Sequence, residues 1–560
     1  MTDDAAYWRA PPGVRRAYVD GRFGQLHYRI ARPESPSAAP LLCVHSSPNS
    51  GRMYAALLSR IGRDRIALAP DTPGFGESDA PSTPPEIADY AAQMGEFLDA
   101  LAIPEADVMG YHTGSKICVE LALQRPRLVR RLVLVSAPLY TDAELARQKA
   151  DHGSPHFDED GSHLQRRWQW LMKYREPGAP LSLVQRNFME GLRGGDTAWW
   201  GHPAAFAYQH RDHLPEVTQP VLVLNPEDDL QAQTARLKDE LDGIELVDLP
   251  GWSHGFCDTH ADELAERLRR FLDAPGEVAA APRAPRDAPL KPAPRRRSVR
   301  RRFVDGPHGQ IHLRIAEPRS PSATPLVCLH MSPNSGRIYE TLLEEMGRDR
   351  LVLAPDTPGF GESDAPDTPP RIEDYAAAMA GLIDGLALPR VDVMGYHTGS
   401  MTAVELALRR PDLVRRVVMI AAPIYTPEEQ ADRQRHNTPR TLSEDGSHLT
   451  ERWRFMRRFY GEDVPIFIVA RNFAEGGRGG PLAWWGHRAA FEYPLADKLP
   501  RVAQPVLVLN PDDDLAEQTP RAEALLRSGR VRRLPGYSHG MLDVHTAEIG
   551  GILREFLNGG

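Results

Sequence analysis

The chain has little cysteine, no excess of basic charge and no long apolar run. The positions of its four cysteines predict small core residues rather than a disulfide framework, since Cys43 and Cys328 lie inside apolar runs. Lysine and arginine number 67 against 76 aspartates and glutamates, which gives no electrostatic footprint for DNA or RNA. No segment approaches a membrane span, and Met1 to Asp4 are acidic rather than signal-like. We therefore expect a cytoplasmic protein with neither a nucleic-acid nor a membrane partner.

Also absent is a glycine-rich loop of the kind that cradles phosphates. The glycine-rich turns of the sequence all fall within the motifs described below. We therefore predict that the protein uses no organic cofactor and that its partner is a small-molecule substrate.

The sequence does contain a long internal repeat. His112 recurs 285 residues later as His397, and the same offset relates Asp229 to Asp514 and His254 to His539. The run 69–81 reappears unchanged at 354–366. A register this long indicates tandem duplication, because solenoid repeats have periods of a few tens of residues. We expect the two copies to act as an intramolecular pseudo-dimer.

Composition marks the boundary between the copies. Residues 274–294 are rich in Ala, Pro, Arg and Asp, which predicts an extended, semi-rigid linker rather than a packed element. The predicted domains are 1–273 and 295–560. The arginine-rich run 295–302 is interpreted as a solvated domain edge, because Val299-Arg300-Arg301 aligns with Val14-Arg15-Arg16 in the first copy.

Each copy alternates short apolar runs with helical patterns. In the first copy, residues 41–44, 66–69, 132–135 and 221–224 are almost continuously apolar, as strands buried on both faces of a parallel sheet are. This alternation predicts an α/β fold with a mostly parallel sheet flanked by helices. The intervals of about 141–217 and 426–502 are polar and helical, and we interpret each as an inserted helical cap over the site.

The most informative motif is Gly110-Tyr111-His112-Thr113-Gly114, repeated at 395–399. Each copy follows an apolar strand and opens an amphipathic helix. That is the context of a nucleophile elbow, a sharp turn that lifts one side chain above the sheet. The lifted residue is usually serine, whereas here it is histidine in both copies.

Two later motifs complete a candidate triad. The strand 221–224 ends in Asn225-Pro226-Glu227-Asp228-Asp229, and a histidine, His254, follows on a short loop. Nucleophile, acid and histidine then appear in the chain order expected for this fold. We select Asp229 over Asp228 as the acid, and likewise Asp514 over Asp513. The predicted triads are His112, Asp229 and His254 in the first copy, and His397, Asp514 and His539 in the second.

A third motif follows the first long strand. His45-Ser46-Ser47-Pro48 corresponds to His330-Met331-Ser332-Pro333 in the second copy. Two converging backbone amides at such a turn stabilise a developing oxyanion. We expect His45 and His330 to hold the loop. The predicted oxyanion-hole residues are Ser47 and Thr113 in the first copy, and Ser332 and Thr398 in the second.

Taken together, these motifs resemble the α/β-hydrolase superfamily. The run Asp71-Thr72-Pro73-Gly74-Phe75-Gly76-Glu77-Ser78 is typical of its capped branch, which includes epoxide hydrolases, haloalkane dehalogenases, and C–C bond and ester hydrolases. The resemblance covers nearly all of both halves except the linker. It implies two tandem α/β-hydrolase domains, each with a cap, and an esterase-like hydrolase. The branch uses Asp or Ser at the elbow, so the histidine departs from its pattern.

The elbow histidine allows several chemistries. Our leading hypothesis is that His112 attacks an ester, thioester, lactone or C–C carbonyl, and that His254 with Asp229 then activates water. In a non-covalent variant, His112 only binds or polarises the substrate. Two histidines and one carboxylate also match a non-haem iron or zinc site, although we predict no metal. A non-catalytic binding protein and a lyase or isomerase are the remaining alternatives.

Aromatic, basic and imidazole side chains of the caps are secondary candidates. Arg186 and Arg471 are expected either to pair with an acidic substrate or to form structural ion pairs. His163 and His202 would face the cleft or cap helices. The expected walls of an apolar substrate pocket are Trp199, Trp200, Trp484 and Trp485, with core packing of the cap as the alternative.

Overall fold

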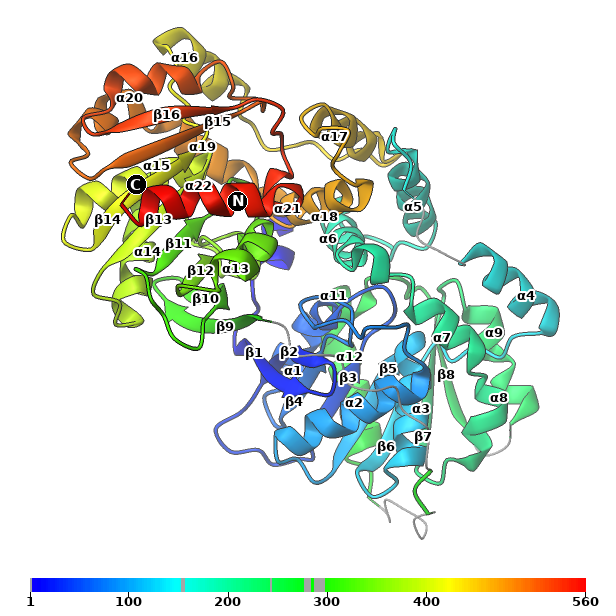
Figure 1. Ribbon diagram of the computed structural model, residues 1–560. Coiled ribbons are helices and arrows are strands. Elements are labelled where there is room, and N and C mark those ends of the chain that lie inside the picture. The colour runs from blue at the N-terminus through cyan, green and yellow to red at the C-terminus, as the bar shows by residue number, and fades with distance from the viewer. Residues whose placement is uncertain (1–2, 153–156, 242–243, 276–283, 287–297, 560) are drawn as a thin grey trace. The chain divides into compact units, whose positions relative to one another are not determined.

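A computed structural model describes residues 3–152, 157–241, 244–275, 284–286 and 298–559. It contains two eight-stranded, mostly parallel sheets with helices on both faces (Figure 1). This confirms the predicted fold class. Among the helices of the described residues, none combines the length and apolarity needed to cross a membrane.

The first sheet is antiparallel at one edge and parallel elsewhere. Its strand order is β1-β2-β4-β3-β5-β6-β7-β8, with antiparallel pairing only of β1 with β2 and of β2 with β4. The parallel strands coincide with the apolar runs of the sequence. The bounds are β1 Val14–Gly21, β2 Gly24–Ala31, β3 Leu41–Val44, β4 Ala67–Pro70, β5 Ala106–Tyr111, β6 Val129–Val135, β7 Val221–Pro226 and β8 Glu245–Leu249.

The second sheet repeats the first strand for strand. Its order, β9-β10-β12-β11-β13-β14-β15-β16, has the same antiparallel edge. The basic run contributes to β9, the counterpart of β1, as expected for the start of the second copy. The bounds are β9 Val299–Gly306, β10 Gly309–Ala316, β11 Leu326–Leu329, β12 Val352–Pro355, β13 Val391–Tyr396, β14 Val414–Ile420, β15 Val506–Pro511 and β16 Gly529–Leu534.

Helices bury both faces of each sheet. In the first sheet, Leu42 and Val44 belong to a core shared with α2 and α3, whereas Leu41 and Cys43 belong to a core shared with α1 and α12. Successive residues of a strand point to opposite faces, so a strand covered on both sides is apolar throughout. The flanking helices are α1 Ala55–Ile61, α2 Ile87–Ala100, α3 Thr113–Gln124 and α12 Ala261–Leu272, with counterparts α13 Glu340–Met346, α14 Ile372–Gly385, α15 Thr398–Arg409 and α22 Thr546–Leu557.

Between β6 and β7, and between β14 and β15, the described residues form helices and turns but no strand. These two stretches are called the insertions below; their role as caps remains a prediction. The first contains α4 Asp142–Asp151, α5 Ser162–Lys173, α6 Leu181–Leu192, α7 Gly201–Ala207 and α8 His210–His213. The second contains α16 Pro427–His436, α17 Ser447–Arg457, α18 Ile466–Gly477, α19 Trp484–Glu492 and α20 Leu495–Lys498.

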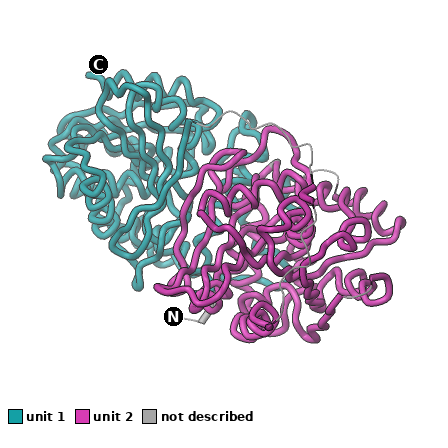
Figure 2. Tube along the Cα trace, turned by 90° about the horizontal axis from the view of Figure 1, so that it is seen from below, with its two compact units in different colours: residues 1–9, 157–164, 297–560 teal, residues 10–156, 165–296 magenta. Residues whose placement is uncertain are grey.

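Contacts divide the chain into two compact units that do not follow the sequence halves strictly. Unit 2 comprises residues 10–156 and 165–296, and unit 1 comprises residues 1–9, 157–164 and 297–560 (Figure 2). Within unit 1, the 157–164 segment packs on α17, where the indole of Trp453 donates a hydrogen bond to the carbonyl of Glu159 at 2.9 Å. A short stretch of the first copy therefore belongs to the body of the second. The predicted boundaries at 273 and 295 remain a prediction.

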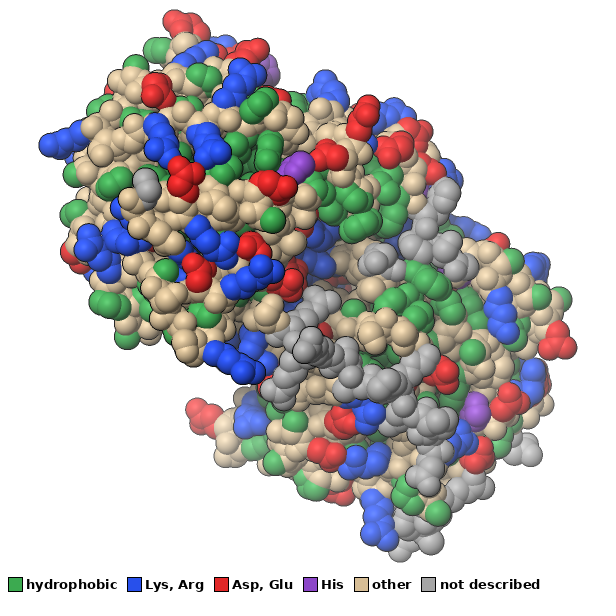
Figure 3. Space-filling view, in the orientation of Figure 1, with side chains coloured by type: hydrophobic (Ala, Val, Ile, Leu, Met, Phe, Trp, Pro, Cys, Tyr) green, Lys and Arg blue, Asp and Glu red, His purple; other side chains and the backbone are tan. Residues whose placement is uncertain are grey.

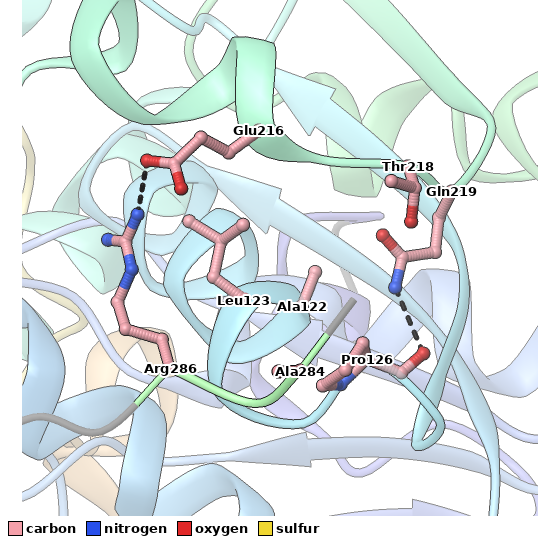
Figure 4. A pocket seen from close by; sticks show the side chains of 8 residues that line it. All are labelled: Ala122, Leu123, Pro126, Glu216, Thr218, Gln219, Ala284 and Arg286. Atoms are coloured by element: carbon pink, nitrogen blue, oxygen red, sulfur yellow. Dashed lines mark hydrogen bonds and ion pairs between the residues drawn. The ribbon is translucent and has the colours of Figure 1, made fainter. Parts of the chain in front are cut away.

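Most of the predicted linker lies outside the described residues, namely 276–283 and 287–294. Its described part is docked on unit 2 rather than extended away from it. Arg286 donates its backbone N–H to Leu123 at 2.9 Å, and its guanidinium forms ion pairs with Glu120 and Glu216. Ala284 and Arg286 thereby line a small pocket against the end of α3 (Figure 4). The composition did not predict this anchoring, which depends on a single arginine.

The surface carries both signs of charge. On the face shown in Figure 3, the described basic and acidic side chains are interspersed over both units. This distribution agrees with the net charge of −9. It gives no reason to revise the expectation that nucleic acid is not a partner.

Candidate functional site

Each elbow histidine occupies the sharp turn between a central strand and the helix that follows it. His112 lies between β5 and α3 with φ 51° and ψ −112°, and His397 between β13 and α15 with φ 47° and ψ −111°. Left-handed φ values are uncommon for residues other than glycine and are typical of functional sites. The sequence context therefore predicted the local backbone correctly in both copies.

The glycines of the motif are required by close packing. A Cβ atom at Gly110 would overlap the carbonyl of Gly114, and a Cβ at Gly114 would overlap the carbonyl of Val44 at the end of β3. The start of α3 is thereby held against the loop that follows β3. Gly395 and Gly399 meet the same obstacles in the second copy. The turn thus brings the elbow and the His45 loop together.

The first site contains two imidazoles and two carboxylates. His112 Nε2 lies 3.0 Å from Asp228 Oδ2 and 3.9 Å from Asp229 Oδ1. His254 Nε2 lies 2.8 Å from Asp229 Oδ1. One donor atom from each of the four residues falls within 4.8 Å of the others. The structure thus brings the three predicted residues together and adds Asp228.

The second site has the same geometry. His397 Nε2 lies 2.9 Å from Asp513 Oδ2 and 3.9 Å from Asp514 Oδ1, and His539 Nε2 lies 3.0 Å from Asp514 Oδ1. Its four donor atoms also fall within 4.8 Å of one another. The aspartates selected from the sequence, Asp229 and Asp514, contact the loop histidines, and the adjacent aspartates contact the elbow histidines.

A tyrosine beside each elbow contacts the loop histidine of its site. The Tyr111 hydroxyl lies 2.9 Å from Asp228 Oδ2 and 3.3 Å from His254 Nδ1. Ser136 donates a further hydrogen bond to Asp228 Oδ2 at 2.6 Å. In the second copy, the Tyr396 hydroxyl lies 3.2 Å from His539 Nδ1. Sequence analysis missed these residues, although the tyrosine lies within the elbow motif itself.

The carboxylates set the electrostatics of both sites. Burial alone would lower the pKa of His112, but the charges of Asp228 and Asp229 outweigh burial and raise it. The pKa of His397 is raised in the same way by Asp513 and Asp514. Burial would raise the pKa of Asp229, yet the two imidazoles lower it. The cluster therefore favours carboxylates in their charged form.

The predicted oxyanion-hole residues flank each elbow. Thr113 is the first residue of α3, where a backbone N–H has no partner within the helix. Among the described residues, the N–H of Ser47 also has no acceptor. The loop that carries it is held by His45, whose Nδ1 lies 2.9 Å from the carbonyl of Ser46 and whose Nε2 accepts the N–H of Thr72 at 2.8 Å. His45 thus holds the loop, as expected.

The aromatic residues that contact the loop histidines differ from those predicted. The His254 ring packs against Trp170 and Tyr174 near the end of α5, with ring centroids 5.8 and 6.2 Å away. The corresponding residues, Phe455 and Phe459, lie near the end of α17, and Phe459 contacts His539. Trp170 is 46% exposed and Phe455 is 52% exposed, so both are open to an incoming molecule. Helical periodicity could have suggested this pair.

The predicted tryptophans have other surroundings. Trp485 is 5% exposed and packs in a small core with Ala5 and Leu482, against which Trp484 also lies. Trp199 and Trp200 are half-buried at the start of α7. For Trp485 these contacts correspond to the packing alternative considered from the sequence. A substrate-binding role for the four indoles remains a prediction.

The two arginines singled out in the insertions form ion pairs with aspartates. Arg186 contacts Asp258 through two nitrogen–oxygen pairs of 3.0 and 2.5 Å, with both side chains almost fully buried. Arg471 pairs with Asp543 in the same way. Among the histidines of the first insertion, His163 accepts the N–H of Asp158 near the start of α5, whereas the ring of His202 contacts that of His152 with the centroids 4.8 Å apart. Burial and neighbouring cations lower the pKa of His202 to about 3.

The donor set of each cluster suits a divalent transition ion. Imidazole nitrogens and carboxylate oxygens are ligands for zinc, iron and related ions, whereas magnesium and calcium prefer oxygen donors alone. Without an ion, the His254–Asp229 pair could act as a general base.

Comparisons with known proteins agree with this architecture. The family model described as alpha/beta hydrolase fold matches residues 39–174 and 324–455. The chain is 32% identical over 259 residues to 2-(acetamidomethylene)succinate hydrolase of Mesorhizobium japonicum, covering 43% of this chain and 90% of that protein. It is 30% identical over 128 residues to an uncharacterised protein of Mycobacterium tuberculosis, covering 23% of this chain and only 36% of that protein. The crystal structure of the enol-lactonase from Burkholderia xenovorans LB400 matches 46% of this chain and 99% of its own, with 24% identity and a TM-score of 0.39.

Proposed function

Because the chain belongs to the α/β-hydrolase fold family, we propose that each half hydrolyses a small carbonyl substrate such as an ester, thioester, lactone or activated C–C bond. The observation that carries the proposal is the contact between His254 Nε2 and Asp229 Oδ1 at 2.8 Å, repeated between His539 and Asp514 at 3.0 Å. A histidine paired with a carboxylate is a general base suited to neutral pH.

Each group of the first site has a role in this reaction. The His254–Asp229 pair, whose Nε2 and Oδ1 atoms lie 2.8 Å apart, takes a proton from water as the water attacks the carbonyl carbon, and returns it to the leaving group. The amides of Ser47 and Thr113 stabilise the oxygen that becomes negative in the transition state. His112 polarises the same carbonyl from the elbow. Bond making to water and bond breaking at the leaving group then occur without an acyl-enzyme.

The geometry favours this route over nucleophilic attack by His112. A nucleophile and its base normally lie within hydrogen-bond reach of each other. Instead, His112 Nε2 contacts the Asp228 carboxylate at 3.0 Å, and its ring centroid is 5.6 Å from that of His254. The same arrangement recurs at His397, which contacts Asp513 at 2.9 Å. Covalent catalysis remains the alternative that the following experiment separates.

The name of the Mesorhizobium relative supports hydrolysis as the reaction class. That protein is called 2-(acetamidomethylene)succinate hydrolase and is matched over 90% of its length. That name favours a small polar carbonyl compound as the first substrate to test.

The test combines steady-state rates with trapping of an intermediate. Wild type, His254→Ala/His539→Ala and His112→Ala/His397→Ala are compared on p-nitrophenyl acetate, with Asp262→Asn on the exposed face of α12 as a control. Loss of the loop histidines should lower kcat/KM about 10²- to 10⁴-fold. After acid quenching, no acetyl group should be found on the peptides that contain His112 or His397. An acetylated elbow peptide would establish the covalent route instead. Equal rates in wild type and both double variants would refute the proposal.

A further inference from the structure

The four donor atoms of each cluster converge as metal ligands do. In the first site the measured nitrogen–oxygen separations are 2.8, 3.0 and 3.9 Å, and in the second they are 2.9, 3.0 and 3.9 Å. Zinc bonds of about 2.0–2.2 Å in a tetrahedron place neighbouring ligands about 3.4 Å apart. The observed separations bracket that value. All four donor atoms of each site lie within 4.8 Å of one another, so side-chain adjustment would bring them onto one ion.

The surroundings hold the ligands in the required orientation. The Tyr111 hydroxyl contacts His254 Nδ1 at 3.3 Å, which leaves Nε2 facing the cluster, and it also contacts Asp228 Oδ2. The other oxygen of Asp228 accepts the backbone N–H of Leu230 at 2.9 Å. In the second site, Asp513 accepts the N–H of Leu515 at the same distance. Metal-binding histidines typically have such a partner on the nitrogen that faces away from the ion.

Charge points to the same conclusion. Asp228 is fully buried, and Asp229 is 21% exposed. Among the described residues, neither forms an ion pair with lysine or arginine, so the two imidazoles are the only partners described for them that can carry a positive charge. Buried carboxylates require a compensating cation. A divalent ion bound by two neutral imidazoles supplies that compensation and uses all four side chains as ligands.

The two copies differ around the cluster but not within it. Ser136, which donates to Asp228, corresponds to Ala421, and Trp252 beside the loop histidine corresponds to Tyr537. The two histidines and two aspartates are present in both sites with nearly equal distances.

We propose that each half of the chain binds one divalent transition ion of the zinc class through two histidines and two aspartates. The ligands are His112, Asp228, Asp229 and His254 in the first site, and His397, Asp513, Asp514 and His539 in the second. Partial exposure of His112 (15%) and His254 (21%) leaves a side open to water or substrate. Ion binding does not rest on the proposed hydrolysis. If both hold, a bound ion takes over the water activation assigned above to His254.

The test measures binding rather than turnover. The full chain is stripped with a chelator and titrated with Zn²⁺ against a chromophoric competitor, and bound metal is counted by mass spectrometry. Wild type should bind two ions per chain, Asp229→Asn and Asp514→Asn one each, and the double variant none. Asp262→Asn, which removes the same charge from an exposed position, should still bind two. Cobalt substitution should give visible absorption bands of a four- or five-coordinate ion, lost in the double variant.

The outcomes separate the metal site from the reaction. Fewer than one ion bound per wild-type chain, or a count unchanged by the double substitution, overturns the metal proposal. Hydrolysis at full rate by the stripped chain in chelator would overturn the ion's role in water activation while supporting the His254 base. Two bound ions without hydrolysis of any ester would support the site and count against the proposed reaction.

The position of one arginine in each insertion indicates the charge of the substrate. The guanidinium of Arg167, on α5, lies against Gly191. A Cβ atom placed on Gly191 would overlap Nη2 of Arg167 and would lie 3.4 Å from the Pro48 ring. Pro48 directly follows Ser47, so the guanidinium lies beside the predicted oxyanion loop. In the second copy, Arg452 meets Gly476 in the same way, and Pro333 lies 3.7 Å from the position of that Cβ. Each arginine thus lies beside the predicted oxyanion-hole loop of its own site.

Neither arginine has an acidic partner. Among the described residues, Arg167 and Arg452 form no hydrogen bond or ion pair. Their guanidinium carbons lie over the rings of Phe188 and Phe473, 5.9 and 4.9 Å from the ring centroids. Burial lowers the pKa of Arg167 to about 10, so it stays charged at neutral pH. Both side chains are partly buried, and a partly desolvated cation without a counter-ion favours an incoming anion. Arg186, by contrast, is already paired with Asp258.

We infer that Arg167 and Arg452 bind a carboxylate of the substrate. This inference rests on the proposed function, since it names the class of carbonyl compound as one that also bears a carboxylate. Guanidinium and carboxylate form two parallel hydrogen bonds, which would fix the distance between the anion and the reacting carbonyl.

The experiment has a binding arm and a kinetic arm. Succinate binding to the chain is measured by calorimetry in wild type, Arg167→Gln/Arg452→Gln and Arg167→Lys/Arg452→Lys. The Gln pair should weaken binding about ten- to hundredfold, and the Lys pair should restore part of it. In turnover, the Gln pair should lose kcat/KM for a monoester of succinate but not for a neutral ester of the same length. Unchanged succinate affinity, or an equal loss on both esters, overturns the inference. Succinate binding without any hydrolysis counts against the proposed function alone.

Discussion

A buried lysine near the first elbow gives a test that the duplication itself controls. Lys116 on α3 is 2% exposed, and its Nζ donates to the carbonyls of Ala205 and Tyr208 at 2.8 and 2.6 Å. Among the described residues, it forms no ion pair with a carboxylate. Its counterpart in the second copy is Met401, which is 1% exposed in the apolar core. We predict that Lys116→Met removes a pH dependence from the stability of unit 2.

The magnitude follows from the pKa. Burial lowers the pKa of Lys116 from 10.5 to about 7. Because the folded-state pKa lies below the unfolded one, the unfolded chain binds more protons between these values, and stability rises with pH. The full cost of burying the charge applies below pH 7 and amounts to about 5 kcal/mol. Between pH 6 and pH 9, the free energy of unfolding should rise by about 3 kcal/mol. The neighbouring His210 stays neutral, because burial lowers its pKa well below 6.5.

The two units can be followed separately through their cysteines. Cys118 lies in unit 2, Cys328 lies in unit 1, and both are fully buried. Denaturant unfolding at several pH values, followed by a short maleimide pulse and mass spectrometry of the two peptides, reports each transition. Only the Cys118 transition should lose its pH dependence in Lys116→Met, while Met401→Leu serves as the matched control.

Parallel pH curves for wild type and Lys116→Met would refute the reasoning, because they would mean that Lys116 is protonated equally in the folded and unfolded states. The difference in the free energy of unfolding between wild type and Lys116→Met at pH 6 is less informative. Met leaves the carbonyl of Tyr208 without its lysine donor, which costs about 1–3 kcal/mol. In the second copy, the carbonyl of Tyr493 instead accepts the N–H of Leu495.

Three further predictions concern the packing of the site. Gly114→Ala should prevent native folding of unit 2, because the new Cβ would overlap the carbonyl of Val44; a native Cys118 unfolding transition would contradict this. Asp258→Asn removes the carboxylate that compensates the charge of the buried Arg186 and should cost about 3–5 kcal/mol in denaturant unfolding. Asp543→Asn should cost less, because Arg471 is 17% exposed and water can solvate it; equal losses would argue against burial as the cause. Ser136→Ala removes the hydrogen bond to Asp228 and should lower zinc affinity at the first site about tenfold, towards that of the second site with Ala421. The reverse change, Ala421→Ser, should raise affinity at the second site, and no change in either titration would refute the assignment.

Much of the fold could be predicted from the sequence because buried parallel strands are apolar throughout. Strands β3, β4 and β7 fall on the predicted runs within two residues, and β6 begins three residues before its run. The antiparallel strand β1 and the edge strand β8 were not predicted, since both contain exposed and half-buried side chains and their apolar signal is weak. The exchange of residues 157–164 into unit 1 depends on tertiary contacts such as that of Trp453, which no local pattern encodes.

The site was predicted in part for a similar reason. Motif spacing identified His112, His254 and Asp229, because each follows the end of a strand in a fixed chain order. The roles of Asp228 and Tyr111 depend on side-chain direction across neighbouring strands, which spacing does not give. The aromatic contacts of Trp170 and Tyr174 depend on how α5 packs within its unit.

The second aspartate follows from the length of the elbow side chain. A serine at the elbow ends one bond beyond Cβ and can reach only a group directly above it, which is why the usual triad places a histidine there. An imidazole carries its Nε2 several bonds further, and in both copies that atom reaches the loop after β7 or β15. There it contacts Asp228 or Asp513, while the adjacent aspartate contacts the loop histidine. In the usual triad the serine, histidine and acid are hydrogen-bonded one after another. With histidine in place of the elbow serine, two imidazoles and two carboxylates instead converge as the four proposed metal ligands. Asp228→Asn should therefore lower metal affinity as strongly as His112→Gln, and a wild-type affinity in Asp228→Asn would mean that the elbow histidine and its aspartate do not act together.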